Sequence, residues 1–426
     1  MKKVKIITLG CRTNQYESQA FFDQLSKKGY VEVEEGEKAD LCIVNTCTVT
    51  ASADKRSLYQ IRKVAREHTP EKLVVTGCFA ERSKKELEKL TEVTDVVSNA
   101  DKNYLLEKVF PEEEWPEFQI ERFEAHTRAF VKIQDGCNSY CSYCIIPYVR
   151  GRSRSKTVPK ILEEIQALVA NGYKEVVLTG INIGDFDGGV TPPARLSDLI
   201  RAVDQIEGLE RIRISSIDPD EVDEDLLRAV IEGKKTCPSM HIVLQSGSNL
   251  TLKRMRRKYT KQDFIDATRR LKEANPNFTF TTDIIVGFPG ETDEEFQETL
   301  ALMDEVQFAK VHMFPYSDRP KTRASRMPNK VPPSVIDQRK NLLMHKAEQG
   351  AFSLRERFIG EEFSLLLEGE ESPGYLMGHT ENFLPVYVPK EGLFPNTIIR
   401  VKCVENQAKG FIGENQVERK VQALLA

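Results

Sequence analysis

The chain has 426 residues, of which 40% are hydrophobic and 30% charged, and its formal net charge is only −4. At about 150 residues per domain, this length predicts roughly three domains, each able to bury its own core. The nearly balanced charge excludes a protein that is basic throughout, so any polyanion site must be a local patch. No apolar run approaches the ~20 residues of a bilayer helix, and residues 1–9 are typical of a short strand rather than a signal peptide. We therefore expect a soluble, cytoplasmic protein.

The N-terminal region alternates short apolar runs with helix-like stretches. The apolar runs are KVKIITLG, ADLCIVNTC, KLVVTGC and TDVVSN. The stretches between them carry helix signals, such as Asn14 before QYESQAFFDQLSKKG and Ser52 before ADKRSLYQIRKVAREH. This pattern predicts a doubly wound parallel α/β domain over residues 1–112. Residues 113–127 are acidic, interrupted by proline and without periodicity, which is typical of a linker.

The central region, residues 128–354, repeats a strand–helix pattern six times. Strands are expected at AFVKIQD, KEVVLTGIN, RIRISSI, MHIVLQS, FTFTTDIIVG and KVHMFPYS, with amphipathic helices between them. Six such units predict an open, partial (β/α)6 barrel whose active site lies at the C-terminal ends of its strands. Residues 355–426 are β-rich and contain FSLLLEG, GYLMGHT, FLPVYVP and TIIRVKCVE, which predict a small β-barrel. The fold class is therefore α/β with a small C-terminal β-barrel.

The strongest motif is GCNSYCSYC, which follows the first predicted barrel strand. It places Cys137, Cys141 and Cys144 in a CxxxCxxC array. A structural zinc ion and an all-cysteine iron-sulfur cluster each take four protein ligands. Three closely spaced cysteines therefore suggest an iron-sulfur cluster that keeps one iron open for a substrate or cofactor. A zinc site completed by a histidine is the alternative.

Three further cysteines share one topological position in the N-terminal domain. Cys11, Cys47 and Cys78 each follow the C-terminal end of a predicted parallel strand. Such ends meet at one edge of the sheet, where open α/β sheets bind ligands, so we expect the three thiols to converge. One such cysteine would be a small buried hydrophobic residue. Three of them predict a second metal cluster, with a redox-active cysteine cluster or a zinc site as the alternatives.

Two three-cysteine sets in this domain order resemble the methylthiotransferases of the radical S-adenosylmethionine (SAM) superfamily. The resemblance covers essentially the whole chain and includes LGCRTNQYES, NTCTVTASADK, QDGCNSYCSYCIIPYVRGRSRS, LTGIN, RISSIDP, LQSGSNLTLKRMRRKYT and DIIVGFPGET. It implies an N-terminal methylthiotransferase domain, a radical SAM core and a C-terminal TRAM domain. LGCRTNQYES and LKRMRRKYT are similar to the MtaB branch, which acts on N6-threonylcarbamoyladenosine at position 37, beside the tRNA anticodon. The near alternatives act on N6-isopentenyladenosine in tRNA or on an aspartate of a ribosomal protein.

The chemistry of this family requires a radical, because adenine C2–H is not acidic enough for a side chain to remove. The resemblance implies that Cys137, Cys141 and Cys144 are the catalytic set and hold a 4Fe-4S cluster, which cleaves SAM to a 5′-deoxyadenosyl radical. Cys11, Cys47 and Cys78 are implied to hold a second 4Fe-4S cluster that delivers sulfur, with a second SAM as methyl donor. The implied partners are a tRNA anticodon stem-loop and an electron donor such as flavodoxin or ferredoxin, without a membrane.

Contacts to SAM and RNA are expected at the strand ends of the barrel. By analogy with the superfamily, the SAM candidates are Tyr143, Ser215, Gln245, Ser246 and Gly287, although each could equally be a turn or cap residue. The RNA candidates form two basic runs, Arg150, Arg152, Arg154 and Lys156, then Lys253, Arg254, Arg256, Arg257 and Lys258, with a third run at Arg319, Lys321, Arg323 and Arg326. Such runs suit phosphate contacts, although many are simply solvated faces. Residues 355–426, with 8 Lys+Arg against 11 Asp+Glu, depart from the basic character expected of an RNA-binding TRAM domain.

Two other classes of function remain open. A non-catalytic RNA-binding protein whose cysteines hold structural zinc would be colourless, whereas iron-sulfur protein is brown. A radical enzyme that performs another reaction, such as methylation, would not need the N-terminal cysteines. Cys42 lies inside the strand LCIVNTC and is expected to face the core, while Cys237 and Cys403 have no Cys or His partner at ligand spacing. The six histidines are scattered and form no metal motif, so we expect no role for any of these residues.

Overall fold

The computed structural model describes residues 1–34, 36–123 and 126–416, and its N-terminal unit is built on a five-stranded parallel sheet. The strand order is β2-β1-β3-β4-β5. The strands are β1 (Lys2–Thr8), β2 (Tyr30–Glu32), β3 (Leu41–Thr46), β4 (Lys72–Gly77) and β5 (Asp95–Val96). The helices are α1 (Arg12–Lys27), α2 (Ala51–His68), α3 (Cys78–Arg82), α4 (Lys84–Leu87), a 3-10 turn (Lys102–Tyr104) and α5 (Leu105–Val109).

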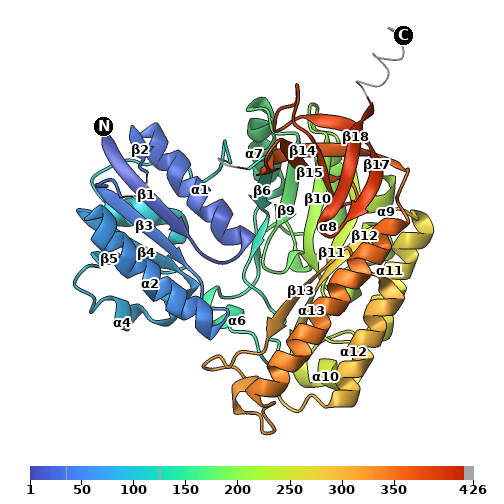
Figure 1. Ribbon diagram of the computed structural model, residues 1–426. Coiled ribbons are helices and arrows are strands. Elements are labelled where there is room, and N and C mark those ends of the chain that lie inside the picture. The colour runs from blue at the N-terminus through green and yellow to red at the C-terminus, as the bar shows by residue number, and fades with distance from the viewer. Residues whose placement is uncertain (35, 124–125, 417–426) are drawn as a thin grey trace.

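Helices cover both faces of this sheet, which confirms the doubly wound prediction (Figure 1). On one face, α1 and α5 contribute Phe21 and Leu106 to a buried cluster. On the other, α2 and α3 contribute Ile61 and Phe79. The central strand β3 is buried along its whole length, because a parallel strand covered by helices on both faces has no solvated side.

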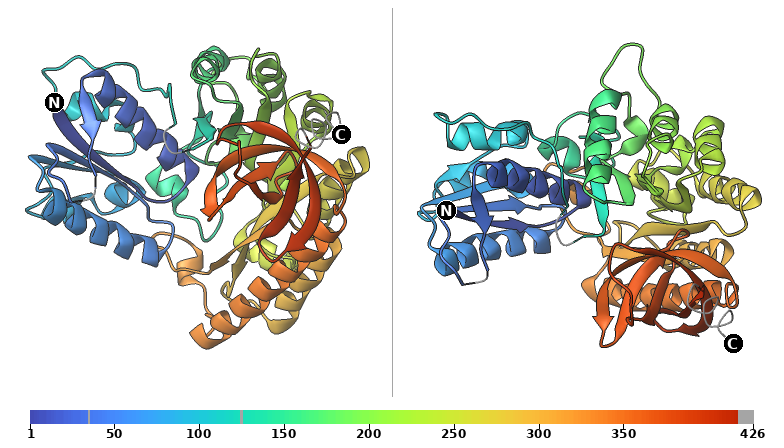
Figure 2. Two further views of the ribbon diagram at one scale, coloured as in Figure 1. Left: turned by 45° about the horizontal axis from the view of Figure 1, so that its top comes forward. Right: turned by 90° about the horizontal axis from the view of Figure 1, so that it is seen from above.

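The central unit is an open sheet of six parallel strands in the order β13-β12-β11-β10-β9-β6. The curved sheet with helices on its outside confirms the partial barrel (Figure 2). Its strands are β6 (Arg128–Lys132), β9 (Glu175–Thr179), β10 (Arg211–Ile217), β11 (Thr236–Ile242), β12 (Thr279–Val286) and β13 (Lys310–Pro315). Its helices are α6 (Ile146–Val149), α7 (Val158–Ala170), α8 (Leu196–Asp204), α9 (Glu224–Glu232), α10 (Asn249–Met255), α11 (Lys261–Ala274), α12 (Asp293–Val306) and α13 (Pro333–Glu356). Further 3-10 turns lie at Ile183–Asp185, Pro219–Glu221 and Ala324–Arg326, and a short ribbon joins β7 (Gln134–Asp135) to β8 (Arg154–Ser155).

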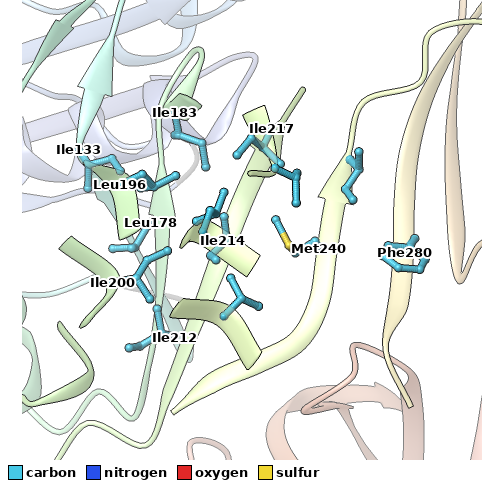
Figure 3. Close-up of a cluster of buried hydrophobic side chains, with 14 of the residues drawn as sticks. Ile133, Leu178, Ile183, Leu196, Ile200, Ile212, Ile214, Ile217, Met240 and Phe280 are labelled. Carbon is cyan, nitrogen blue, oxygen red and sulfur yellow. The ribbon is translucent and has the colours of Figure 1, made fainter. Parts of the chain in front are cut away.

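Successive side chains along these strands point to opposite faces of the sheet, and this separates an apolar outer face from a polar inner face. Leu178, Ile214 and Met240 belong to the large buried cluster under the helices (Figure 3). Residues at alternate positions, such as Arg213 on β10 and His241 on β11, line a cavity on the concave side instead. The apolar face supplies the core, and the concave face is left for polar chemistry.

The acidic stretch predicted as a linker packs as a strap between the first two units. Ile120 and Phe123 are buried in the core of the central unit. The Asp23 carboxylate on α1 accepts hydrogen bonds from the backbone N–H groups of Glu121 and Arg122, at 2.7 and 3.3 Å. Burial of these side chains fixes the N-terminal unit beside β6 more firmly than a solvated linker would.

The C-terminal unit is a closed β-barrel in the order β14-β15-β16-β18-β17. Its strands are β14 (Glu362–Ser372), β15 (Tyr375–Thr380), β16 (Pro385–Pro389), β17 (Ile398–Gln407) and β18 (Gly410–Asn415). The first four match predicted runs, whereas β18 was missed because GFIGEN is short and contains two glycines. Residues 417–426, the end of the predicted domain 355–426, lie outside the described residues.

This small barrel closes the half-barrel at the N-terminal ends of its strands. Arg211 and Arg213 on β10 donate hydrogen bonds to the carbonyl oxygens of Ser364 and Thr380, at 2.6 and 2.7 Å. Thr279, at the start of β12, bonds to the carbonyl of Asn382. The opposite end of the half-barrel, where the cysteine loop lies, is therefore left free of the C-terminal unit. Among the described residues, no helix is long and apolar enough to cross a membrane.

Candidate active site

The three N-terminal cysteines lie at one edge of the five-stranded sheet. Cys11 caps the start of α1 after β1, Cys47 follows β3, and Cys78 is the first residue of α3 after β4. The approach is close, since a Cβ atom at Gly10 would lie 3.0 Å from Cys47 Sγ. Burial, together with the neighbouring thiols of Cys78 and Cys11, raises the pKa of Cys47 to about 11. The structure thus brings together the three thiols that the topology predicted would converge; we call them the edge triad.

A glycine is required where the chain turns into Cys78. Gly77 has φ +97°, and a Cβ atom there would lie only 2.4 Å from the carbonyl oxygen of Thr46. Both the left-handed backbone and the contact with β3 exclude a side chain. The TGC sequence therefore lets β4 end against β3 and deliver the thiol of Cys78 to the same edge.

Cys137, Cys141 and Cys144 lie in one loop between β7 and α6; we call them the loop triad. The Cys144 N–H donates to the carbonyl of Cys141 at 3.0 Å, and the Ser139 N–H lies 3.4 Å from Cys137 Sγ. Ser142 anchors the loop, since its N–H donates to the carbonyl of Met255 and its carbonyl accepts from the Ala324 N–H. The loop is held on both sides by segments that follow other barrel strands.

A buried arginine contacts the loop triad directly. The Arg257 side chain is 6% exposed, and its Nη1 lies 2.9 Å from Cys141 Sγ. Its other arm pairs with Asp218, at the end of β10. Arg257 was predicted to contact RNA, and its burial corrects that prediction: the guanidinium faces a cysteine rather than solvent. Helix α10 ends at Met255, and the chain after it folds back over the loop.

The two triads are neighbours in space. Helix α6 begins two residues after Cys144, and it packs against α3, whose first residue is Cys78. Ile145 and Val149 form a buried apolar cluster with Cys78. The Asn99 side chain also donates to the carbonyl of Val149, at 2.6 Å. One helical turn therefore separates the loop triad from the edge triad.

A buried ion cluster lies beneath the edge triad and joins the first two units. Arg150, at the end of α6, is 3% exposed, and its Nη1 lies 3.0 Å from Glu17 and 2.8 Å from Asp135. Lys102 and Lys132 also bind Glu17, at 2.6 and 3.1 Å. Arg150 was predicted to contact RNA, and this burial corrects that prediction as well. The run around Arg150 looks like a surface patch in sequence, but α6 directs Arg150, the residue that follows it, into the interface.

The expected SAM contacts differ in their surroundings. Gln245 has φ +64°, and its side-chain Oε1 is buried without a hydrogen-bond partner among the described residues. Ser246 is 1% exposed and already bonds to Ser248 N–H, while Ser215 lies near Thr179 on the inner face. Gly287 donates its N–H to Glu291. An orphaned amide oxygen suits a polar ligand, so Gln245 fits a cofactor contact better than Ser246 does.

Tyr143 sits at the apolar side of the cysteine loop. Its ring packs edge-on against Phe288, with centroids 6.4 Å apart, in a cluster with Met255. This cluster forms an apolar wall beside the cysteine loop. Burial raises the pKa of the Tyr143 phenol well above its ordinary range, so the ring stays neutral.

The remaining basic residues divide into exposed and paired groups. Arg152, Arg154, Lys253, Arg256 and Lys258 are exposed, and all lie in segments that follow the barrel strands β6 and β11. Arg154 also pairs with Asp135, at 2.9 Å. Arg254 instead pairs with Glu295. In the third run, Arg319 is buried against Asp54 of the N-terminal unit, at 2.6 Å. The exposed group is therefore the part of the predicted RNA surface that can reach a phosphate.

Two features were missed by reasoning from the sequence. Exposed Tyr140, inside the cysteine motif, lies edge-on to exposed Tyr148 on α6, with centroids 6.2 Å apart. The histidines that looked scattered include two neighbours on the concave face, since the rings of His241 and His312 lie 5.8 Å apart. Strand order alone could have signalled this pair, because β11 and β13 flank β12.

Among the described residues, no group of three or more His, Cys, Asp or Glu side chains has the arrangement that holds a single metal ion.

Comparisons with known proteins cover nearly the whole chain. The profile of the Radical SAM superfamily matches residues 131–303, and that of the Uncharacterized protein family UPF0004 matches residues 3–99. Threonylcarbamoyladenosine tRNA methylthiotransferase MtaB of Chlamydia pneumoniae is 47% identical, covering 96% of this chain and 97% of that protein. The MtaB protein of Thermotoga maritima is 37% identical, covering 99% and 100%. A tRNA-2-methylthio-N(6)-dimethylallyladenosine synthase of Clostridium novyi is 35% identical, covering 89% of each.

A solved structure supports the fold. The radical S-adenosylmethionine methyltransferase TsrM from Kitasatospora setae, with cobalamin and a 4Fe-4S cluster bound, matches with a TM-score of 0.56 at 14% identity, over 76% of this chain and 77% of that one. Over that share of its length, the chain therefore has the fold of this radical SAM enzyme. Together with relatives that match almost end to end, this shows that the chain belongs to the methylthiotransferase family of radical SAM enzymes.

Proposed function

We propose that this protein replaces the C2–H of N6-threonylcarbamoyladenosine, at position 37 of tRNA, by a methylthio group. The observation that carries the proposal is the juxtaposition of two three-cysteine sets, joined through Cys78 and Ile145, at the open end of a radical SAM half-barrel. A reaction at an unactivated C–H bond that also inserts sulfur needs two metal clusters beside one substrate. The names of the relatives at 47% and 37% identity support the same substrate.

The residues present fit the cofactors that the family implies. Cys137, Cys141 and Cys144 would hold one 4Fe-4S cluster, and Cys11, Cys47 and Cys78 would hold the other. Gln245, with its unpartnered buried oxygen, would contact SAM. When bound, these groups supply a 5′-deoxyadenosyl radical, the sulfur and the methyl group. Because burial raises the pKa of Cys47 to about 11, loading the edge triad releases protons as its thiols become thiolates.

The chain itself positions and insulates these groups. Arg257 donates to Cys141 Sγ and thereby stabilises negative charge on that sulfur, while Asp218 holds the guanidinium in place. Ile145 and Val149 exclude water from the space beside Cys78. The packing of α6 against α3 fixes the separation of the two triads, so one substrate base can reach both.

An RNA substrate would approach over the exposed basic residues beyond the strand ends. Arg152, Arg256 and Lys258 are placed to contact phosphates of an anticodon stem-loop. Sequence-specific RNA recognition requires bases that leave the helical stack and rest on aromatic side chains. The exposed pair Tyr140 and Tyr148, beside the loop triad, offers such a surface. The proposal includes a cytoplasmic location, where tRNA is found, and an electron donor such as flavodoxin or ferredoxin.

Mass spectrometry of tRNA nucleosides tests this proposal. A host that lacks the modification would express either the parent chain or its Cys141→Ala variant. We expect methylthio-threonylcarbamoyladenosine with the parent chain and none with the variant. A methylthio group on isopentenyladenosine instead would overturn the substrate, a possibility favoured by the Clostridium novyi relative. No change in either nucleoside would overturn the tRNA proposal and make the ribosomal protein the next substrate to assay.

A further inference from the structure

Arg12 lies between the N-terminal sheet and the half-barrel. It follows Cys11 directly and is the first residue of α1. Its guanidinium lies over the ring of Phe130 on β6, 5.4 Å from the centroid, so it reaches from the sheet edge into the half-barrel. Among the residues that the structure describes, it makes no hydrogen bond and no ion pair. An arginine that is half-buried in this state is unusual, because burial of a charge is costly unless it is paired.

The other arginines of the same cavity are fully engaged. Arg213 binds Glu175 at 2.6 Å and the carbonyl of Thr380 at 2.7 Å. Arg128 binds Glu368 at 3.0 Å. The bonds to Thr380 and Glu368 belong to the contact with the C-terminal barrel and hold that end of the half-barrel closed. The guanidinium of Arg12 is therefore the one in this cavity that is left for a ligand, within the described part of the chain.

The cavity is small and polar. It has a volume of about 50 Å³, and Arg12, Phe130, His241 and Thr281 line it. A water molecule occupies about 30 Å³, so the space suits a polar group of a few atoms rather than a whole base. Within the described part of the chain, His241 Nε2 has no hydrogen-bond partner, and Asp283 is its acidic neighbour at 3.3 Å. The guanidinium of Arg12 and the imidazole of His241 thus face one pocket.

We infer that Arg12 binds the carboxylate of the threonylcarbamoyl group and selects this substrate over neutral N6-substituted adenosines. The inference rests on the proposed function and names the residue that would read its side chain. An arginine pairs with a carboxylate through two parallel hydrogen bonds, which give geometric specificity as well as affinity. The adjacent residue, Cys11, belongs to the edge triad. Holding the N6 substituent at Arg12 therefore keeps the adenine ring, and its C2 atom, beside that triad.

An apolar N6 substituent would leave Arg12 unpaired. An isopentenyl group offers no hydrogen-bond acceptor, so binding it would cover the half-buried guanidinium without pairing its charge. The same residue thus attracts one substrate and penalises the other. A backbone phosphate is the competing ligand, but the exposed basic residues that suit phosphates lie outside the half-barrel, whereas Arg12 points into its concave face.

The test compares one RNA in two chemical forms. Synthetic anticodon stem-loops would carry threonylcarbamoyladenosine either as the free acid or as its methyl ester, which removes the charge and keeps the shape. The proteins are the reconstituted parent chain and its Arg12→Gln, Arg12→Lys and Arg62→Gln variants. Arg62→Gln is the matched control, because Arg62 is exposed on α2 and its substitution removes the same positive charge from the same N-terminal unit. The measurements are kcat/KM for methylthio product and Kd by fluorescence anisotropy.

We expect the parent and Arg62→Gln to favour the acid over the ester by about 10- to 100-fold, the range for a hydrogen-bonded charge. Arg12→Gln should lose that preference, because its kcat/KM and affinity for the acid RNA fall while those for the ester RNA stay within about 2-fold of the parent. Arg12→Lys should keep part of it. Iron and sulfide content and SAM cleavage without RNA should be unchanged in all variants, which separates substrate reading from damage to a cluster.

Several results would overturn the inference. If Arg12→Gln lost activity and affinity equally for the acid and the ester RNA, Arg12 would contact the RNA backbone or stabilise the fold instead. An unchanged acid-to-ester ratio in Arg12→Gln would show that another group reads the carboxylate. If Arg12→Gln does not fold, a parent chain that fails to distinguish acid from ester would by itself refute the idea. No product from the acid with the parent chain would overturn the proposed function, and this inference with it.

Discussion

The two cysteine triads reach neighbouring positions by different routes. The loop triad comes from eight consecutive residues, 137–144, that are pinned at Ser142. The edge triad comes from three strand ends that lie 36 and 31 residues apart in sequence, and its geometry depends on strand order and on Gly77. A local loop keeps its cysteines together even when the surroundings shift. The edge triad exists only while the whole N-terminal sheet is folded, so its metal should depend more strongly on fold stability.

The charges around the triads differ as well. A single guanidinium, that of Arg257, contacts the loop triad at Cys141. Beneath the edge triad lies a cluster of three buried cations and two carboxylates, which also joins the N-terminal unit to the half-barrel. The first arrangement acts on one sulfur atom. The second couples the edge triad to the docking of two domains.

The largest expected effect separates the two triads by their partial reactions. Cys141→Ala should abolish both 5′-deoxyadenosine formation and methylthio product. Cys47→Ala should retain deoxyadenosine formation and lose the product, because the loop triad is intact. Each variant should hold roughly half of the parent's iron. Chromatography of the nucleosides and iron assays measure these quantities. Methylthio product from Cys47→Ala would refute the sulfur-delivering role of the edge triad, and deoxyadenosine from Cys141→Ala would refute the placement of the first cluster.

The next effect tests the coupling of the edge triad to domain docking. Arg150→Met leaves Glu17 and Asp135 buried without their main partner, and breaking a buried ion cluster costs about 3–5 kcal/mol. Urea unfolding should show this loss in the free energy of unfolding, and the iron of the edge triad should be released at lower urea than that of the loop triad. Arg152→Met, two residues away and exposed, is the control, with an expected change within about 0.5 kcal/mol. Equal shifts for both variants would contradict a structural role of Arg150.

The pH dependence of the same cluster gives a smaller effect. Burial alone would raise the pKa of Glu17, but Arg150, Lys102 and Lys132 lower it well below its ordinary value of 4.5. A carboxyl group with a lowered folded-state pKa stabilises the fold above the unfolded pKa and loses this contribution as pH falls. Glu17→Gln should therefore be less stable than the parent at pH 7, and the difference should shrink below pH 4.5.

Thermal unfolding between pH 7 and pH 3 measures this difference. Glu88→Gln is the control, because Glu88 forms an exposed pair with Lys84 and should be nearly neutral at every pH. A stability gap between the parent and Glu17→Gln that stays constant down to pH 3 would show that the carboxylate is not held ionised by its three cations.

The smallest expected effect concerns the surface around the loop triad. Arg256→Gln and Lys258→Gln should each weaken stem-loop binding only a few-fold, and each should lower the slope of log Kd against log salt concentration by about 0.7–0.9. The same shift should occur with a stem-loop of unrelated sequence, because phosphate contacts carry no sequence information. Arg62→Gln is again the control. A loss confined to one RNA sequence would indicate base recognition at these residues instead.

The sequence alone supports much of this picture, for reasons that particular residues illustrate. CxxxCxxC spacing needs no fold to be recognised, and the alternation of strands and helices predicts parallel sheets whose ends bring Cys11, Cys47 and Cys78 to one edge. The predictions that the structure corrects share one cause. Arg150 and Arg257 belong to basic runs that resemble solvated patches, and only the packing of α6 and the chain after α10 turns them inward. The strap at residues 113–123 is acidic and aperiodic, yet Ile120 and Phe123 are buried.

By itself, the sequence determined the fold class, the order of the three units and the six cysteines, because periodicity and short-range spacing are local properties of the chain. Only the tertiary structure decided which charged side chains are buried and paired. It also decided which ones, like Arg12, reach into the half-barrel with no ion pair to any described residue. The physical reason is that the fate of a charge depends on the neighbours that folding brings to it from distant segments. The contact of Arg150 with Glu17, across 133 residues, is such a neighbour, and no pattern within either segment encodes it.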